Sequence, residues 1–193
     1  MGIRFAGTPR VPTSSASSIQ STQATIDAAL DAARKKGIDT LIVASATGAS
    51  ARLLLGSKGF KVVVVTHVFG FPEPGGTEFD PETRVELLSA GFSVLTTAHA
   101  LSAGERALSS KFGGAYPLEI VANTLRLFGQ GTKVAVEVAT MALDAGLIPY
   151  GRPVIALGGT NNGLDTALVI VPAGSARLFD TKILDVVARP TTF

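Results

Sequence analysis

Three short apolar runs, each followed by a polar turn and then by helix-forming residues, constrain the fold of this chain most. The runs cover residues 40–44, 61–65 and 93–96, and most of their residues are β-branched. Uniformly apolar strands separated by helices are typical of a largely parallel sheet with helices on both faces. A chain of 193 residues is long enough for one such domain with a buried core. We therefore expect a single α/β domain over residues 21–193.

The segment before this domain has a different composition. Residues 1–20 are expected to form an N-terminal tail, or a short strand at Ile3–Phe5 followed by a Pro-, Ser- and Thr-rich loop at Thr8–Ser18. A helix is expected to begin near Ser21 or Thr22, whose hydroxyl groups suit an N-cap, and to end at Gly37.

The second half of the chain predicts helices first and strands afterwards. Residues 99–147 are expected to be mostly helical, whereas the short glycine-rich connection between the last two apolar runs favours an antiparallel pair. The expected elements are helices at Pro81–Leu88, from Pro117 to a break at 129–131, and at Val134–Ala145, strands at Pro153–Leu157 and Thr166–Val171, and an edge element at Lys182–Val187.

Composition excludes several classes of protein. The chain has no cysteine, which excludes disulfide scaffolds, thiolate metal sites and thiol nucleophiles. The net charge is +2 and basic residues form no run longer than Arg34–Lys36, so no nucleic-acid partner is expected. No apolar run reaches the roughly 20 residues that span a bilayer. We therefore expect a cytoplasmic protein with no membrane partner.

The turn after the first apolar run is the strongest indication of a ligand. Ser45, Thr47 and Ser50 surround Gly48 where a strand gives way to helix-forming residues. Hydroxyl groups and free backbone N–H groups at the start of a helix suit an anion. The alternative is that small residues here serve only close packing. Arg52 either faces such an anion or lies in solvent, and the absence of a P-loop lysine argues against nucleoside triphosphate hydrolysis.

Five segments, taken in order and spacing, give a resemblance to a known family. The chain resembles the C-terminal α/β domain of pyruvate kinase, and more closely the stand-alone proteins built from that domain without the catalytic barrel. The resemblance runs from about Ser21 to Pro190. The matching segments are Leu41–Gly48, Val62–Gly70, Leu95–Ser102, Phe128–Glu137 and Val154–Ala167.

The resemblance implies a three-layer α/β/α sandwich with a mixed five-stranded sheet of order 3-2-1-4-5, in which strand 5 is antiparallel. Ligands of such sheets bind beyond the carboxyl ends of the strands where the strand order reverses, here between strands 1 and 4. Pyruvate kinase activity is not expected, because the catalytic barrel is missing. The implied ligand is a phosphorylated small molecule such as a sugar phosphate, a nucleotide or flavin mononucleotide.

Two turns meet at that reversal, and the resemblance places the ligand between them. Ser45, Thr47, Gly48 and Ser50 match the turn that cradles a phosphate in pyruvate kinases that respond to sugar bisphosphates. The second turn matches only in part and lacks the tryptophan and the basic residue of the kinases, which argues against fructose-1,6-bisphosphate. The expected ligand-binding residues are Ser45, Ala46, Thr47, Gly48, Ala49, Ser50, Thr66, His67, Gly158, Gly159, Thr160, Gly163, Asp165 and Thr166.

Other polar residues have two interpretations each. Gly158–Thr166 is either a ligand turn or a hairpin turn, in which Asp165 accepts a ligand hydroxyl or caps the turn. His67 and His99 follow neighbouring strands and have no obvious carboxylate partner, so no metal site is expected. They act as acid–base groups or satisfy backbone groups.

Charged residues in the segments shared with the stand-alone family are interpreted as structural. Glu105 and Arg106 could reach the rim of the sheet, and Glu105 is a further catalytic candidate beside the two histidines. Glu137 lies in an otherwise apolar helix, so it needs a partner or a polar pocket. Gln130 and Lys133 belong to the same segment, and structural ion pairs are the simplest explanation for this group.

Three functions follow as hypotheses. The first is binding of a phosphorylated small molecule at the strand 1/strand 4 reversal. The second is an enzyme that acts on such a metabolite with His67 or His99. The third is a regulatory module that associates with itself or a partner, which makes a homo-oligomer a further expectation.

Overall fold

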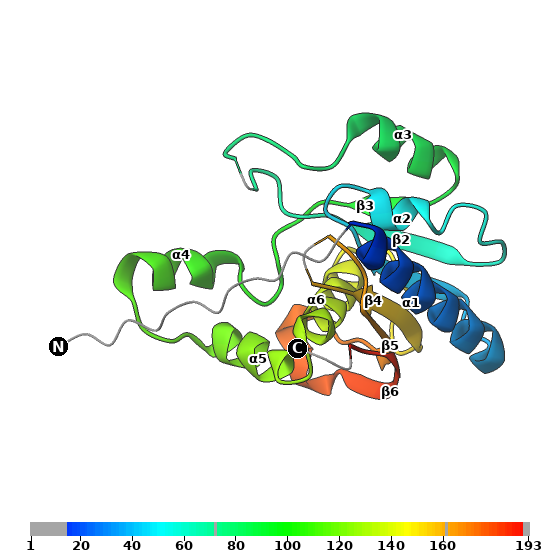
Figure 1. Cartoon of the computed structure of the whole chain (residues 1–193). Helices are drawn as coiled ribbons and strands as arrows, with labels where there is room; N and C mark the ends of the chain where they lie inside the picture. Colours follow the sequence, from blue (N-terminus) through cyan, green and yellow to red (C-terminus); the bar gives the residue numbers. More distant parts are fainter. Residues whose placement is uncertain (1–14, 72, 161, 191–193) are drawn as a thin grey trace.

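A six-stranded mixed sheet organises the molecule (Figure 1). The computed structural model describes residues 15–71, 73–160 and 162–190. The strands are β1 (Thr40–Ala44), β2 (Lys61–Val65), β3 (Ser93–Leu95), β4 (Val154–Gly158), β5 (Thr166–Val171) and β6 (Lys182–Ala188), in the order β3-β2-β1-β4-β5-β6. Strands β1 to β4 are parallel to one another, whereas β5 is antiparallel to both β4 and β6. The expected order and the antiparallel fifth strand are confirmed.

The expected number of five strands is wrong, because β6 extends the sheet. The candidate edge element at Lys182–Val187 pairs with β5 over residues 182–188. Its side chains are mostly exposed. A prediction based on buried apolar runs therefore identifies this segment only as a candidate edge element.

Helices cover both faces of the sheet. On one face, α1 (Ser15–Lys36) and α3 (Pro81–Ser89) pack against a cluster that includes Leu41, Val64 and Leu157. On the other face, α6 (Gln130–Asp144) covers a cluster that includes Ile42 and Val63. The short helices α4 (Ala103–Phe112) and α5 (Pro117–Arg126) extend from α6 to one side, as Figure 1 shows, and α2 (Ala49–Arg52) has four residues.

Helix boundaries differ from the expectation in two places. Helix α1 begins at Ser15, so residues 15–18 of the expected loop are helical, and the strand expected at Ile3–Phe5 lies outside the described residues. Helix α6 begins at Gln130 and includes Gly131, which the sequence placed in a break. Gly131 is required there by packing, since a Cβ atom would lie 2.2 Å from Thr166 Oγ1.

Local sequence signals explain the remaining boundaries. Asp80 caps α3 by accepting a 2.8 Å hydrogen bond from the Thr83 N–H, and Pro81 follows in the first turn. Gly37 has a φ of 65° and ends α1 behind three basic residues, as the dipole favours. In residues 15–71, 73–160 and 162–190, no helix combines the length and apolar character needed to cross a membrane.

Candidate functional site

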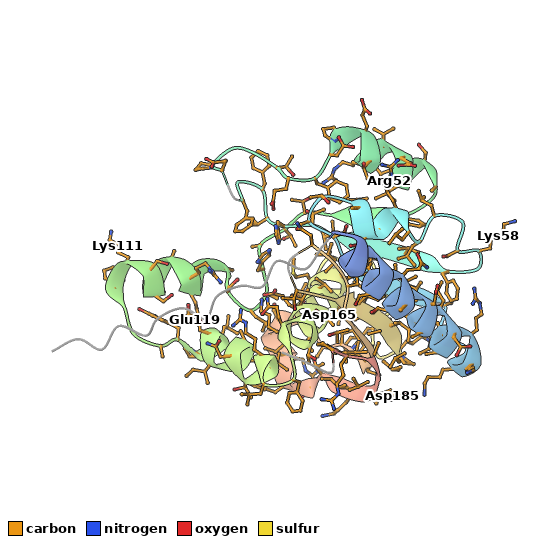
Figure 2. The ribbon with its side chains drawn as sticks, viewed as in Figure 1. Arg52, Lys58, Lys111, Glu119, Asp165 and Asp185 are labelled. Atoms are coloured by element: carbon orange, nitrogen blue, oxygen red, sulfur yellow. The ribbon has the colours of Figure 1, made fainter. Side chains whose placement is uncertain are left out.

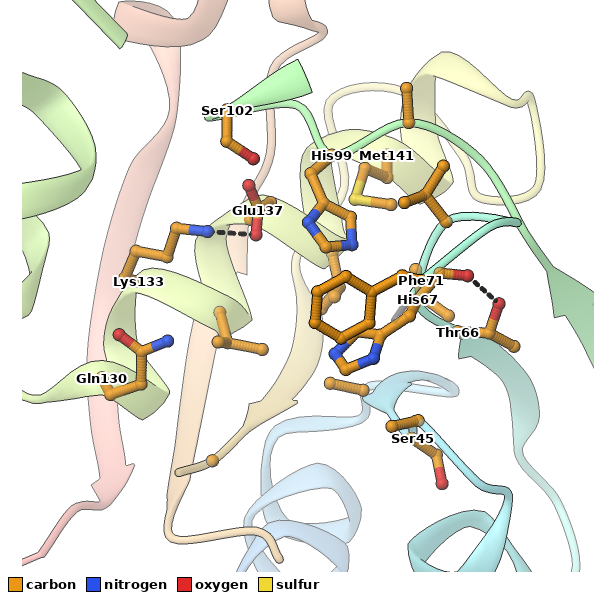
Figure 3. A pocket seen from close by; sticks show the side chains of 18 of the residues that line it. Ser45, Thr66, His67, Phe71, His99, Ser102, Gln130, Lys133, Glu137 and Met141 are labelled. Atoms are coloured by element: carbon orange, nitrogen blue, oxygen red, sulfur yellow. Dashed lines mark hydrogen bonds and ion pairs between the residues drawn. The ribbon is translucent and has the colours of Figure 1, made fainter. Parts of the chain in front are cut away.

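A cavity of about 610 Å³ lies at the carboxyl ends of the parallel strands (Figure 3). Its walls come from the β1–α2 turn, the segments after β2 and β3, the β4–β5 turn and the inner face of α6. This is the reversal of strand order between β1 and β4 where the sequence placed a ligand. The expected ligand residues in its lining are Ser45, Ala46, Thr47, Ala49, Ser50, Thr66, His67, Gly159 and Gly163.

The β1–α2 turn contributes hydroxyl groups to the cavity. The hydroxyls of Ser45 and Ser50 make no hydrogen bond with the residues that the structure describes, whereas Thr47 Oγ1 accepts a 3.4 Å bond from the Ala49 N–H. The following helix α2 has a single turn, so its dipole is small and the expected contribution of a helix amino end is weak. The hydroxyl groups and backbone N–H groups of the turn are therefore the polar groups that this wall presents to the cavity.

Gly48 is absent from the cavity lining and serves packing. Its φ is 94°, and a Cβ atom there would lie 2.5 Å from Thr83 Cγ2 and 3.2 Å from Phe79 Cζ. Arg52 likewise points elsewhere, since its Nε forms a 2.8 Å ion pair with Glu86 on α3 (Figure 2). The packing alternative therefore accounts for the glycine, and the structure places Arg52 beside a carboxylate.

Of the described residues of the β4–β5 turn, Gly159, Asn162 and Gly163 line the cavity. A Cβ atom on Gly158 would lie 2.2 Å from the carbonyl oxygen of Gly131, so this glycine allows α6 to approach the sheet. The Thr166 hydroxyl donates a 2.7 Å hydrogen bond to Asp165. This bond is a local interaction of the turn and involves no ligand. Four expected ligand residues outside the lining are Gly158, Thr160, Asp165 and Thr166.

The two histidines meet in the cavity, as the strand order predicted. The ring centroids of His67 and His99 are 5.8 Å apart, and Phe71 contacts the His67 ring edge to face. The expectation that neither histidine has a carboxylate partner is wrong, because His67 Nδ1 lies 2.5 Å from Glu78 Oε2. Glu78 follows a loop of Gly and Pro residues, and nothing in the sequence pattern linked that loop to His67.

Burial and neighbouring charges change the proton affinity of His99. Desolvation lowers the pKa of His99 below its ordinary value of 6.5; Glu137 opposes this effect, and Lys133 adds to it. His99 is therefore neutral near pH 7 and able to accept a proton from a ligand.

Helix α6 places a buried ion pair on the cavity wall. Lys133 Nζ donates to Glu137 Oε2, and both residues are about 95% buried, with exposed fractions of 5% and 4%. Glu137 Oε1 accepts a 2.9 Å hydrogen bond from the Leu101 N–H, which anchors the segment between β3 and α4. The expected ion pair is present, and the structure adds that it faces the cavity beside His99 (Figure 3).

Two arginines share this wall with the ion pair. The guanidinium group of Arg106 forms no hydrogen bond or ion pair with the described residues, and that of Arg126 bonds, among these residues, only the neutral side chains of Gln130 and Asn123. Of the described charged residues that line the cavity, three are cationic and one is anionic. Glu105 lies outside the lining and accepts a 2.8 Å bond from the Leu118 N–H, which ties α4 to α5.

Some lining residues were missed by sequence reasoning. Phe71, Ser102, Arg126 and Met141 line the cavity, but each lies in a segment whose sequence carries no ligand signal. The one usable signal was the Lys133/Glu137 pair, because charges at i and i+4 in an apolar helix need a polar environment.

No group of three or more metal-ligating side chains occurs in the described part of the chain.

Comparison with known proteins agrees with this architecture. Residues 23–170 match the family model described as the pyruvate kinase alpha/beta domain. A pyruvate kinase from Cryptosporidium parvum is 18% identical with a TM-score of 0.41, over 78% of this chain and 23% of that chain. Another structure of pyruvate kinase from this organism is 16% identical with a TM-score of 0.38, over 85% of this chain and 24% of that one. This chain thus spans about a quarter of the length of those kinases, and it belongs to the pyruvate kinase alpha/beta domain family.

Proposed function

We propose that the cavity binds a phosphorylated small molecule, with the phosphoryl group at the Ser45–Ser50 turn. The observation that carries the proposal is that the Ser45 and Ser50 hydroxyls have no hydrogen-bond partner among the described residues, in a cavity whose described lining has an excess of cationic side chains. Phosphate oxygens accept hydrogen bonds from hydroxyl and backbone N–H groups, and positive potential favours the dianion.

The cavity is much larger than a phosphate group alone. Its volume of about 610 Å³ falls within the roughly 300–1,000 Å³ typical of sites for drug-sized ligands. The organic part of the ligand therefore extends from the turn toward Phe71, Met141 and the histidines. A sugar phosphate, a nucleotide and flavin mononucleotide all have this combination of an anionic end and a larger body.

Thermal denaturation with added ligands tests the proposal. Inorganic phosphate, glucose 6-phosphate and flavin mononucleotide are the probes, and a ligand at about 100 times its dissociation constant adds roughly 2.7 kcal/mol to the free energy of unfolding. The Thr47→Ala, Ser50→Ala double variant is expected to bind the effective probe roughly tenfold to a hundredfold more weakly. Ser89→Ala removes an exposed hydroxyl outside the cavity and is the matched control. Unchanged affinity in the double variant would contradict the proposal.

The His67–Glu78 contact favours an enzyme as a second candidate function. A carboxylate that contacts Nδ1 of an imidazole orients the ring, as in general-base pairs. His99, 5.8 Å from His67 between ring centroids, is suited to the complementary proton transfer. A reaction that disappears in His67→Ala, with ligand affinity retained, would separate this function from binding alone.

The exposed edge of the sheet favours self-association as a further candidate. Ile183, Leu184 and Val186 on β6 are 42–58% exposed on the outer strand. An apolar edge strand with free backbone groups is a template for pairing with another strand. Light scattering tests this function, and a monomer at high protein concentration would contradict it.

A further inference from the structure

Lys133 has fewer hydrogen-bond acceptors than its ammonium group requires. The side chain is buried on the cavity wall, to which the same helix also contributes the apolar residues Val134, Val138 and Met141. A lysine ammonium has three N–H donors, and Glu137 is its one acceptor among the described residues. Because unfilled donors on a buried charge are costly, this group favours either a ligand acceptor or loss of its proton.

The surroundings of Lys133 promote the neutral amine. Arg126 from α5 and Arg106 from α4 repel a further positive charge, and burial lowers the pKa of Lys133 more than Glu137 raises it. His99 faces the same region from the segment after β3, as Figure 3 shows. A neutral lysine amine in a closed site is a nucleophile toward carbonyl compounds.

We propose that Lys133 forms an imine with a phosphorylated aldehyde or ketone bound in the cavity, an inference that rests on the proposed function. The ammonium gives a proton to Glu137, and the amine nitrogen then attacks the carbonyl carbon. A C–N bond forms while the C=O π bond opens, and protonated Glu137 gives its proton to the oxygen, which becomes a hydroxyl group. The nitrogen then gives one of its two protons to this hydroxyl group, which leaves as water as the C=N bond forms, so the product is a protonated imine beside the Glu137 carboxylate. The step needs no oxidant or reductant.

Glu137 is the proton acceptor of this step. Its Oε1 is held by the Leu101 N–H at 2.9 Å, so Oε2 stays directed at Lys133. The hydroxyl-rich turn holds the phosphoryl group at another wall of the same cavity. The substrate class is therefore a small phosphorylated carbonyl compound whose two functional groups reach both walls.

Trapping of the imine by reduction tests the inference on the whole unmodified chain. Pyridoxal 5′-phosphate and the smaller glycolaldehyde phosphate are the probes, followed by sodium borohydride, proteolysis and mass spectrometry. Lys133 is expected to be the main modified residue, ahead of exposed lysines such as Lys58 and Lys111, which Figure 2 shows at the periphery. Inorganic phosphate at about ten times its dissociation constant is expected to slow the modification roughly tenfold.

Matched variants separate the imine-forming amine of Lys133 from its positive charge. Lys133→Arg keeps the positive charge but cannot form an imine, so modification should be lost while phosphate still stabilises the protein. Lys58→Arg is the control and should leave the labelling of Lys133 unchanged. If Lys133→Arg does not fold, mapping on the wild-type chain still decides the question.

The outcomes distinguish this inference from the proposed function. Stabilisation by phosphate with Lys133 unmodified by both probes would overturn the inference and leave the proposed function standing. Modification of Lys133 that phosphate does not slow, and that pyridoxal without its phosphate matches in rate, would support the imine and contradict the phosphate site.

Discussion

The two walls of the cavity achieve polarity in different ways. The β1–α2 turn offers uncharged hydroxyl and N–H groups close to solvent, whereas α6 presents the buried ions Lys133 and Glu137. The first wall is one continuous sequence motif. The second combines residues from α4, α5, α6 and the segment after β3. A polar site can therefore be visible in a sequence on one side and hidden on the other.

Substitutions in the buried wall should cause the largest losses in the free energy of unfolding. Glu137→Ala leaves the Lys133 charge unpaired and the Leu101 N–H without its acceptor, so we expect a loss of about 3 kcal/mol in the free energy of unfolding. Urea denaturation measures this loss. Glu82→Ala, an exposed glutamate on α3, should change the value by less than about 0.5 kcal/mol.

A double variant sharpens the same comparison. Replacing both members of the pair, Lys133→Met with Glu137→Leu, removes the unpaired charge and should recover much of the stability lost by Glu137→Ala. A loss below about 1 kcal/mol in the single variant would mean that the pair is effectively solvated by the cavity, and the contrast between the two walls would fail.

At the hydroxyl-rich wall, we expect the stability to depend on the packing of Gly48 and the affinity for a ligand to depend on the hydroxyl groups. Gly48→Ala introduces a Cβ atom 2.5 Å from Thr83 Cγ2 at a φ of 94°, and we expect a loss of about 2 kcal/mol. Gly56→Ala is the control, because it has a similar φ of 83° and nothing within 4 Å of the added atom. Thermal denaturation of both variants compares packing with backbone strain. Equal losses would show that strain alone requires the glycine.

Removal of the close contact should rescue that variant in part. Thr83→Ser deletes Cγ2 and retains the hydroxyl that donates to Asp80. The Gly48→Ala, Thr83→Ser double variant should therefore be more stable than the sum of the two single effects, as expected for residues in contact.

His99, which lies between the two walls, should make the free energy of unfolding depend on pH. The folded-state pKa of His99 is lowered by burial, so the unfolded chain binds this proton more readily. Stability is then fully present above the ordinary pKa of about 6.5 and is lost as pH falls from there to the folded-state value. His99→Gln should show a smaller loss of unfolding free energy between about pH 7 and 5, in denaturation curves measured at each pH. An identical pH dependence in the variant would contradict this assignment.

The smallest effect should come from Arg52, which leaves the hydroxyl-rich wall to pair with Glu86. The side chains are 55% and 39% exposed, and exposed pairs contribute about 0.5 kcal/mol. Arg52→Ala should therefore lower stability only slightly and leave phosphate affinity unchanged by titration. A clear loss of affinity would return Arg52 to the ligand site.

The spacing of hydroxyl residues identified residues that line one wall of the cavity. Similar reasoning at the β4–β5 turn named four residues that lie outside the lining. Gly158 at that turn, together with Gly131 on α6, allows the helix to approach the sheet. Sequence alone does not distinguish a glycine that admits a ligand from one that admits a helix, because both need the same missing side chain. Glu78 was missed as the partner of His67 because the loop that joins them folds back without a periodic pattern.

The family resemblance indicated the place where strand order reverses, and the sequence by itself determined the strands and most of the helix boundaries. These depend on local patterns: β-branched apolar runs, caps, and the short connection that makes β4 and β5 antiparallel. Only the tertiary structure decided that His67, His99, Lys133 and Glu137 share one cavity, and that β6 extends the sheet. Burial, pKa and hydrogen-bond partners arise from residues far apart in the chain, such as Leu101 and Glu137, and local sequence carries no record of such contacts.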